Sequence, residues 1–225
     1  MINRFFRKFG YKRKTIKTII PKIDISKIIP EDVSIKILEP YVVNGNVVPL
    51  ELIVINKIIK FHKPNNLFEI GTFDGRTTLN LAANSLENSK IFTLDLLRSD
   101  LNKTKLPIIE GDKVHINKEF SGLRFKNNPY SRNIIQLYGD SAKFDFSPYY
   151  NKIDFIFVDG SHSSEYVLND SEVALKLLNK KKGIILWHDY GMNSVSNALN
   201  KLYLEDNRFK NLKHITETSL VYLVF

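Results

Sequence analysis

The chain has 225 residues, 43% of them hydrophobic, which is enough for one α/β domain with a sizeable core. It contains no cysteine, which excludes disulfide bonds and thiolate metal ligands. No apolar run approaches the ~20 residues of a membrane-spanning helix, and the basic start is not followed by the apolar run of a signal peptide. We therefore expect a cytoplasmic protein.

The formal net charge of +9 is concentrated at the start of the chain. Eight of the 33 Lys and Arg residues lie within residues 1–22, which contain no acid, so 25 basic residues face 24 acidic ones in the remainder. This balance argues against a specific nucleic-acid partner. We interpret residues 1–30 as a basic arm and residues 31–225 as the folded domain.

Two interpretations of the arm remain open. Aromatic and aliphatic residues are interleaved with the charges of residues 1–22, and this pattern fits peripheral contact with the anionic inner surface of a membrane. The alternative is a disordered tail, or a tail exchanged between the subunits of a homo-oligomer.

Beyond the arm, helix and strand patterns alternate. A first helix is expected over 49–62, because Pro49 suits a first helical turn and Pro64 follows its end. Next come strand 67–71, helix 76–86, strands 91–95, 133–138 and 153–158, helix 164–180, strand 183–187, helix 193–204, and closing strands near 211–216 and 218–225. Such alternation predicts an α/β fold, Rossmann-like and doubly wound, with a mostly parallel sheet and helices on both faces.

Residues 97–132 interrupt this rhythm, since a short helix would suffice to connect the neighbouring strands. Loops of this length in a compact domain usually carry function or are disordered. We therefore interpret the segment as an insertion that forms a lid or a substrate wall. An extra helix with a flexible connection is the alternative.

The loop after strand 67–71 has the pattern of a nucleotide-type cofactor site. Gly71 ends the strand, Gly75 lets the backbone approach a ligand, and the helix that follows presents free N–H groups near Thr77. The G-x-x-x-G spacing and the acidic Glu69 disfavour a dinucleotide, whose diphosphate needs three glycines and no carboxylate. The amino group and sulfonium of S-adenosylmethionine would instead be attracted by the acids, and its carboxylate by the helix N-terminus.

Two further strand ends fit the same cofactor. Asp95 ends strand 91–95 at the spacing expected of a carboxylate that accepts ribose hydroxyls. Asp140 and Ser141 follow strand 133–138 and can hydrogen-bond an adenine edge. For this last pair a helix-capping turn is the alternative, because Asp and Ser favour such positions.

Five short motifs in register carry a resemblance to a known family. They are Phe68-Glu69-Ile70-Gly71 with Gly75, then Asp95, Gly139-Asp140-Ser141, Val158-Asp159-Gly160-Ser161-His162 and Trp187-His188-Asp189-Tyr190. Together they resemble a class I S-adenosylmethionine-dependent O-methyltransferase, and within it the branch of macrocin-type sugar O-methyltransferases and cephalosporin hydroxylase-like proteins. The resemblance implies a seven-stranded sheet with an antiparallel last strand.

The carboxyl ends of strands 153–158 and 183–187 supply candidate metal ligands. If these strands are neighbours, about 4.8 Å apart, Asp159 can share one small ion with His188 and Asp189. Metal-dependent members of the resembling family usually have an acid where this chain has His188. The expected metal is Mg or Mn, and the imidazole favours Mn, Fe or Zn over Mg. The alternatives are a capping role for Asp159 and a backbone-bonded, buried His188.

His162 follows Asp159 in the same loop, where the resemblance implies a general base. A neutral imidazole can take the proton of a substrate hydroxyl while the methyl group is attacked. Asp159 and His162 are therefore the predicted catalytic residues. The alternative for His162 is to hold its loop in place, and His62, His115 and His214 are interpreted as structural or surface residues.

The sequence thus predicts methyl transfer from S-adenosylmethionine to a hydroxyl of a small molecule, such as a sugar of a glycan or of a secondary metabolite. Two alternatives stay open. One is a hydroxylase-like enzyme on the same fold, because fold does not fix function. The other is a module that binds the cofactor without turnover.

Overall fold

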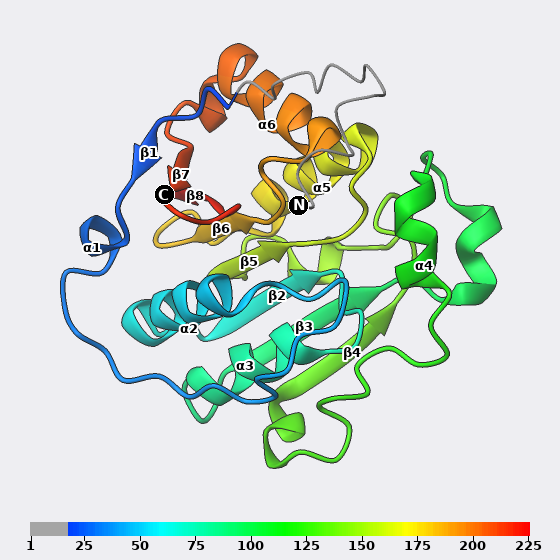
Figure 1. The fold of residues 1–225 in the computed structure, drawn as a ribbon, viewed down its shortest axis with the longest axis horizontal. Helices are drawn as coiled ribbons and strands as arrows, with labels where there is room; N and C mark the ends of the chain where they lie inside the picture. The colour runs from blue at the N-terminus through cyan, green and yellow to red at the C-terminus, as the bar shows by residue number, and fades with distance from the viewer. Residues whose placement is uncertain (1–17) are drawn as a thin grey trace, which may run out of the picture.

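The structure, a computed structural model, describes residues 18–225 (Figure 1). Residues 1–17 lie outside the described residues, and with them every basic residue of segment 1–22 except Lys22. The predicted membrane contact therefore falls almost wholly outside the described part of the chain. Within residues 18–225, no helix has the length and apolar character needed to span a bilayer.

Within residues 18–225, eight strands form one sheet in the order β1-β7-β8-β6-β5-β2-β3-β4. Its parallel centre consists of β2 (Asn66–Ile70), β3 (Lys90–Asp95), β4 (Ile134–Tyr138), β5 (Phe155–Val158) and β6 (Ile184–Trp187). The last strand, β8 (Val221–Val224), lies between β6 and β7 (Lys213–Ile215) and is antiparallel to both. The predicted mostly parallel sheet with an antiparallel last strand is confirmed.

The eighth strand comes from the segment interpreted as the end of the arm. β1 (Lys22–Ile23) pairs in parallel with β7 at the edge of the sheet. Just before it, the backbone N–H groups of Ile19 and Ile20 donate to the hydroxyl of Tyr190, at 2.9 and 3.1 Å. A two-residue strand is too short to show periodicity, so the hydrophobic pattern could not predict it.

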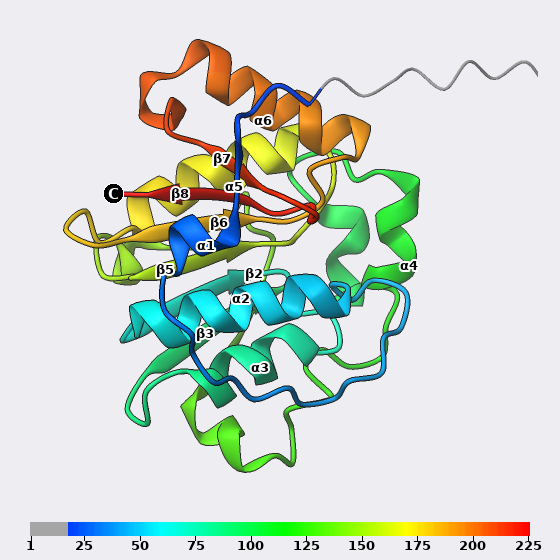
Figure 2. The same cartoon turned by 60° about the vertical axis from the view of Figure 1, so that its left-hand side comes forward.

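Helices cover both faces of the sheet (Figures 1 and 2). On one face lie α2 (Pro49–His62) and α3 (Arg76–Asn84), and on the other α5 (Ser164–Leu177) and α6 (Asn193–Glu205). The shorter helices are α1 (Ile25–Ile28) and α4 (Lys113–Ile116). The doubly wound arrangement predicted from the alternation of elements is therefore confirmed.

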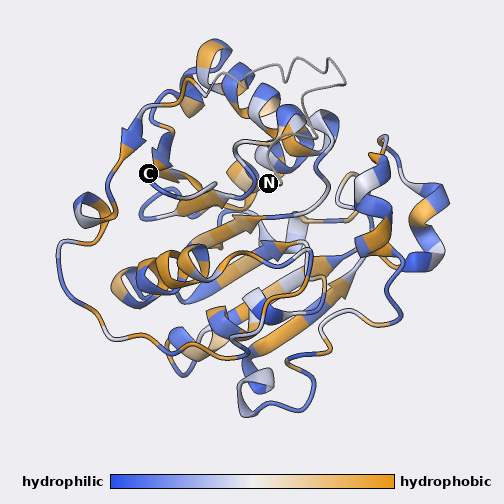
Figure 3. Cartoon of the chain, in the orientation of Figure 1, coloured by the Kyte–Doolittle hydropathy of each residue, from blue (hydrophilic) through white to orange (hydrophobic). Residues whose placement is uncertain are grey.

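Strand β5 shows how the two hydrophobic cores are divided. Phe155 and Phe157 belong to the core beneath α2 and α3, and Ile156 and Val158 to the core beneath α5 and α6. Successive strand residues point to opposite faces, and a central parallel strand is covered on both. All four residues of β5, and all four of β6, are accordingly apolar and buried (Figure 3).

Residues 97–132 form a series of short helical turns that attaches to the loop after β2. The N–H of Gly122 donates to the carbonyl of Phe73 (3.0 Å), and the N–H of Arg124 to that of Asp74 (2.9 Å). The Arg124 guanidinium also pairs with the Asp74 carboxylate at 2.7 Å. Besides α4, the segment contains 3-10 helices at Arg98–Lys103, Glu110–Asp112 and Pro129–Asn133.

Candidate functional site

Two adjoining cavities lie at the carboxyl edge of the parallel strands, where open α/β sheets bind their ligands. The inner cavity, of about 110 Å³, is lined by Leu94, Asp95, Ile108, Asp140, Ser141 and Tyr166 among others. The outer cavity, of about 550 Å³, is lined by Asn44, Asn46, Glu51, Thr77, His188 and Asp189 among others. Both cavities share a wall that includes Gly71, Phe73, Asp112, Asp159 and His162.

The two glycines of the loop after β2 each permit a close approach of the chain. Gly71 has a φ of +103°, and a Cβ there would lie 2.0 Å from the carbonyl oxygen of Asp159. Gly71 is therefore required where the ends of β2 and β5 meet. Gly75, predicted to let a ligand approach, has a φ of +85°, and a Cβ there would lie 2.7 Å from Cα of Gly122. In the structure the close approach at Gly75 is thus made by the insertion.

Glu69 lies behind the cavity wall, and its exposed fraction is 0%. One carboxyl oxygen accepts hydrogen bonds from the hydroxyls of Thr78 and Thr93. Burial raises the pKa of Glu69 to about 8, and the nearby Asp159 and Asp95 charges add to this. These hydrogen bonds connect β2 with β3 and α3 in the interior of the domain. The geometry therefore gives Glu69 a structural role in place of the predicted contact with the cofactor.

Asp95, the predicted ribose ligand, lines the inner cavity but is already engaged by the insertion. Its carboxylate pairs with the ammonium of Lys118 at 2.8 Å and accepts a hydrogen bond from Ser121. Burial raises the pKa of Asp95, and Lys118 and Ser121 oppose that rise. Ribose hydroxyls would therefore have to share or replace these two partners.

Asp140 and Ser141 also reach the inner cavity, as the predicted adenine contacts require. The Asp140 carboxylate accepts hydrogen bonds from the Tyr166 hydroxyl and the Lys105 N–H, both at 2.7 Å. It also caps its own turn through the N–H of Ala142 (2.9 Å), so the capping role considered as the alternative is present as well. Thr77 lies in the first turn of α3 and lines the outer cavity.

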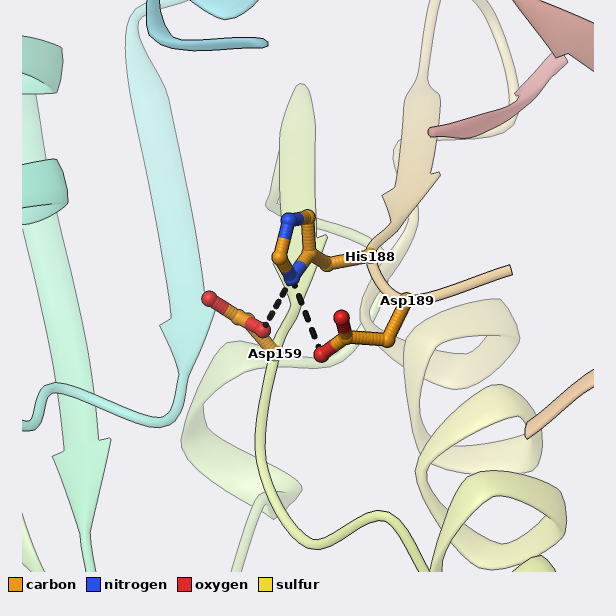
Figure 4. A group of neighbouring side chains, drawn as sticks. All are labelled: Asp159, His188 and Asp189. Atoms are coloured by element: carbon orange, nitrogen blue, oxygen red, sulfur yellow. Dashed lines mark ion pairs between the residues drawn. The ribbon is translucent and has the colours of Figure 1, made fainter. Parts of the chain in front are cut away.

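The three predicted metal ligands converge at the ends of β5 and β6 (Figure 4). One donor atom from each of Asp159, His188 and Asp189 lies within 4.8 Å of the others. Nδ1 of His188 lies 3.0 Å from a carboxylate oxygen of each aspartate. Two ligand atoms about 2.1 Å from an ion and at right angles to each other are about 3 Å apart, so this spacing fits a divalent ion.

The orientation of the His188 ring supports the same fit. Nε2 lies 2.8 Å from the Glu51 carboxylate, whereas the buried Nδ1 has no partner with hydrogen-bond geometry among the described residues. The alternative of a histidine bonded to the backbone is therefore not what the structure has. Burial lowers the pKa of His188, but Asp159, Asp189 and Glu51 together raise it well above the usual value. A protonated ring or a bound cation would each satisfy the carboxylates.

His162 lies between two carboxylates on the wall shared by both cavities. Its Nδ1 is 2.5 Å from Asp112 and its Nε2 is 2.7 Å from Asp189. Burial lowers the pKa of His162, but the two acids prevail and raise it to about 10. In this arrangement the ring holds a proton at neutral pH.

Three residues of the site carry no signal in the sequence. Asp112 lies in the insertion, where no motif marks it, and Glu51 reads as an ordinary acid in the first turn of a helix. His115, interpreted above as structural or surface, lines both cavities and packs edge-on against Phe73. The two other histidines fit that interpretation: His62 packs against Phe61, and His214 bonds the carbonyl of Thr218.

The sheet order, with β8 antiparallel between β6 and β7, and the cavities at the carboxyl edge of the parallel strands define a Rossmann-like α/β fold. Residues 68–190 match the family model described as a methyltransferase domain, so the chain belongs to this family and the predicted enzyme class is confirmed. A search of curated proteins gives no significant match.

Solved methyltransferase structures share the fold. An O-methyltransferase of Bacillus cereus in complex with SAH is 16% identical, with 81% of this chain and 84% of that chain covered and a TM-score of 0.53. The SAH-bound methyltransferase PaMTH1 of Podospora anserina is 18% identical, with 80% of each chain covered and a TM-score of 0.56. A third structure is the O-methyltransferase TomG of Streptomyces achromogenes, involved in tomaymycin synthesis, in complex with SAM. It is 14% identical, with 80% of this chain and 82% of that chain covered and a TM-score of 0.53. At these identities the likeness concerns the fold alone.

Proposed function

We propose that this chain is an S-adenosylmethionine-dependent O-methyltransferase that acts on a hydroxyl group of a small molecule with the help of a divalent ion. The observation that carries the proposal is the wall between the two cavities. There a candidate proton acceptor, His162, and a candidate metal ligand, Asp159, face both cavities at once. A cofactor whose nucleoside lies in the inner cavity and whose carboxylate reaches Thr77, and an acceptor in the rest of the outer cavity, would meet at this wall.

Three features support S-adenosylmethionine as the cofactor. Asp95 and Asp140 line the inner cavity, where they suit ribose hydroxyls and an adenine amino group. Thr77 and the N-terminus of α3 border the outer cavity and suit a carboxylate. In addition, proteins of the same fold have been crystallised with SAM or SAH.

The chemistry of transfer divides between the bound groups and the chain. S-adenosylmethionine, when bound, supplies an electrophilic methyl group, and a divalent ion held by Asp159, His188 and Asp189 supplies positive charge that favours the anionic form of a nearby hydroxyl. The chain itself positions the acceptor, a task worth about 7–11 kcal/mol when reacting atoms are held aligned. We assign to His162, on the wall between the cavities, the role of taking the proton of the hydroxyl.

The double contact of His162 sets a condition on that role. Because both ring nitrogens of His162 contact a carboxylate, the ring can reach the proton of a hydroxyl only after one of these contacts is exchanged for the acceptor. Asp189 is the contact that His162 shares with the candidate metal site. We therefore infer that the Asp112 contact persists during turnover and that the Asp189 contact is the one exchanged.

A sugar is the substrate class that we propose for the outer cavity. Asn44, Asn46 and Asp74 supply donors and acceptors along its lining, in keeping with a ligand that carries several hydroxyls. The resemblance to the macrocin-type branch adds to this proposal.

Incubation with methyl-labelled S-adenosylmethionine and a panel of hydroxylated acceptors tests the proposed function. We expect label to reach an acceptor oxygen, and calorimetry to show binding of S-adenosylmethionine and its demethylated product but not of NAD. Preference for NAD would refute the proposal. Oxidation of an acceptor without label transfer would support a hydroxylase, and cofactor binding without any turnover would support a binding module.

A further inference from the structure

The Glu51 carboxylate is buried beside the candidate metal site and receives four hydrogen bonds. Glu51 is the third residue of α2, and its exposed fraction is 4%. One oxygen accepts from the N–H of Val48 (3.3 Å) and lies 2.8 Å from Nε2 of His188. The other accepts from the N–H and the hydroxyl of Ser219, both at 2.7 Å. Glu51 thus connects the start of α2 to the loops that end β6 and precede β8.

These contacts decide which nitrogen of His188 carries hydrogen when the ring is neutral, the form in which imidazole binds a metal ion. Backbone N–H groups can only donate, so Glu51 accepts from Val48 and Ser219, and an ionised carboxylate has no hydrogen to offer in return. Nε2 of His188 must therefore be the donor to Glu51. Nδ1 is then the nitrogen that faces Asp159 and Asp189, each 3.0 Å away.

A second connection runs from Glu51 to Asp189. The Ser219 hydroxyl donates to Glu51 and accepts a hydrogen bond from the N–H of Asp189, at 3.2 Å. Asp189 has a φ of +62°, a left-handed conformation that is uncommon outside glycine. Glu51 therefore supports two of the three candidate ligands, His188 directly and Asp189 through Ser219.

We propose that Glu51 is a positioning residue of the metal site, which directs Nδ1 of His188 toward the ion and fixes Asp189 through Ser219. The inference rests on the proposed metal assistance and extends it to residues outside the family match, since Glu51 and Ser219 both lie beyond residues 68–190. Partners that orient ligating histidines in this way typically change metal affinity by about 10–100-fold when they are removed.

Calorimetry with Mn²⁺ on the full chain is the first test. We expect Glu51→Gln to bind Mn²⁺ about 10–100-fold more weakly than the wild type, because the amide places a donor against His188 or Ser219. Ser219→Ala, which keeps the His188 bond, should lose less. Glu205→Gln, which changes an exposed acid at the end of α6, is the matched control and should bind like the wild type. Binding of SAH by each variant serves as the check that it is folded.

A second measurement needs no substitution of Glu51. In wild-type protein with ¹⁵N-labelled histidine and bound Zn²⁺, long-range ¹H–¹⁵N correlations report which ring nitrogen carries hydrogen. We expect hydrogen on Nε2 of His188, assigned by its loss in His188→Gln. Hydrogen on Nδ1 would overturn the inference.

The outcomes separate this inference from the proposed function. Equal Mn²⁺ affinity in Glu51→Gln and the wild type overturns the role of Glu51 and leaves methyl transfer intact. Weaker binding in Glu51→Gln without any methyl transfer by the wild type supports the role and refutes the proposed activity. A wild-type chain that binds no Mn²⁺ overturns both the metal site and the inference.

Discussion

Asp112 and His162 are 50 residues apart in the sequence, yet a carboxylate oxygen of Asp112 lies 2.5 Å from Nδ1 of His162. The other Asp112 oxygen accepts hydrogen bonds from the Ser161 hydroxyl and from the N–H of His162. Because Asp112 belongs to residues 97–132, the insertion contributes a side chain to the site itself.

Asp112→Asn should lower turnover by about 10–100-fold, with little change in KM for the acceptor. The substitution removes one of the two negative charges that contact His162. It also turns an amide N–H₂ toward the Ser161 hydroxyl, the His162 N–H or the His162 Nδ1, each of which now donates to Asp112. Steady-state kinetics measures the effect, and ¹⁵N NMR titration should show a lower pKa for His162. An unchanged pKa and turnover would contradict the role given to Asp112.

His162→Gln should lose on the order of 10²–10⁴-fold in turnover, which is the usual contribution of general acid–base catalysis. Glutamine keeps hydrogen-bonding atoms between Asp112 and Asp189, so cofactor affinity should stay near that of the wild type. Labelled-methyl kinetics and calorimetry give the two quantities, and His62→Gln on the far end of α2 is the control. Near-normal turnover would leave activation of the hydroxyl to the metal site.

Asp159→Asn should lose metal binding and activity together while it retains SAH binding. The residue supplies one of three candidate ligand atoms, and an amide oxygen without charge binds divalent ions less tightly. Mn²⁺ and SAH calorimetry measure the two affinities, with Asp145→Asn, at an exposed turn, as the control. Full activity of the wild type in a strong chelator would remove the metal from the mechanism.

Gly71→Ala should destabilise the fold by about 1 kcal/mol or more and weaken SAH binding, because φ is positive there and the new Cβ would meet the Asp159 carbonyl at 2.0 Å. Gly111→Ala is the matched control, since a Cβ at Gly111 meets no atom within 4 Å. Urea unfolding gives the free energies. Equal stability of both variants would show that the ends of β2 and β5 adjust easily.

Glu69 should make the protein less stable as the pH rises from about 4.5 to about 8. Its pKa is raised in the folded state, so its contribution is complete below the unfolded value and is lost as the pH rises through the folded one; each pKa unit corresponds to about 1.4 kcal/mol. In Glu69→Gln this part of the pH dependence should vanish. Urea unfolding at a series of pH values measures it, and parallel profiles for both proteins would exclude the effect.

The parallel core was predictable because its signals are local. Residues 155–158 form a continuous apolar run. Pro49 begins α2 and Pro64 follows its end, and the helix has the predicted bounds. The convergence of Asp159, His188 and Asp189 followed from the rule that parallel strands end at one edge.

The contacts that complete the site were not predictable, since they join segments far apart in the chain. The Glu51–His188 contact spans 137 residues and the Glu51–Ser219 contact 168, and no local pattern encodes either. Gly75 carries a turn signal that does not reveal what approaches it, which is Gly122. An acid before a glycine turn likewise does not reveal that Glu69 points into the sheet and away from the cavities.

The hydroxyl of Tyr190 gives the start of the described chain a practical significance. It accepts from the backbone of Ile19 and Ile20 and donates to Asn200, and Tyr190 directly follows Asp189. A shortened chain that begins at Pro30 would therefore lose a strand and two anchors one residue from the candidate metal site. The expected contact of the basic segment with a membrane can be tested by comparing the binding of anionic vesicles to the full chain and to a shortened chain. The shortened chain should begin at Thr18, so that a change in binding is not confused with damage to the candidate metal site.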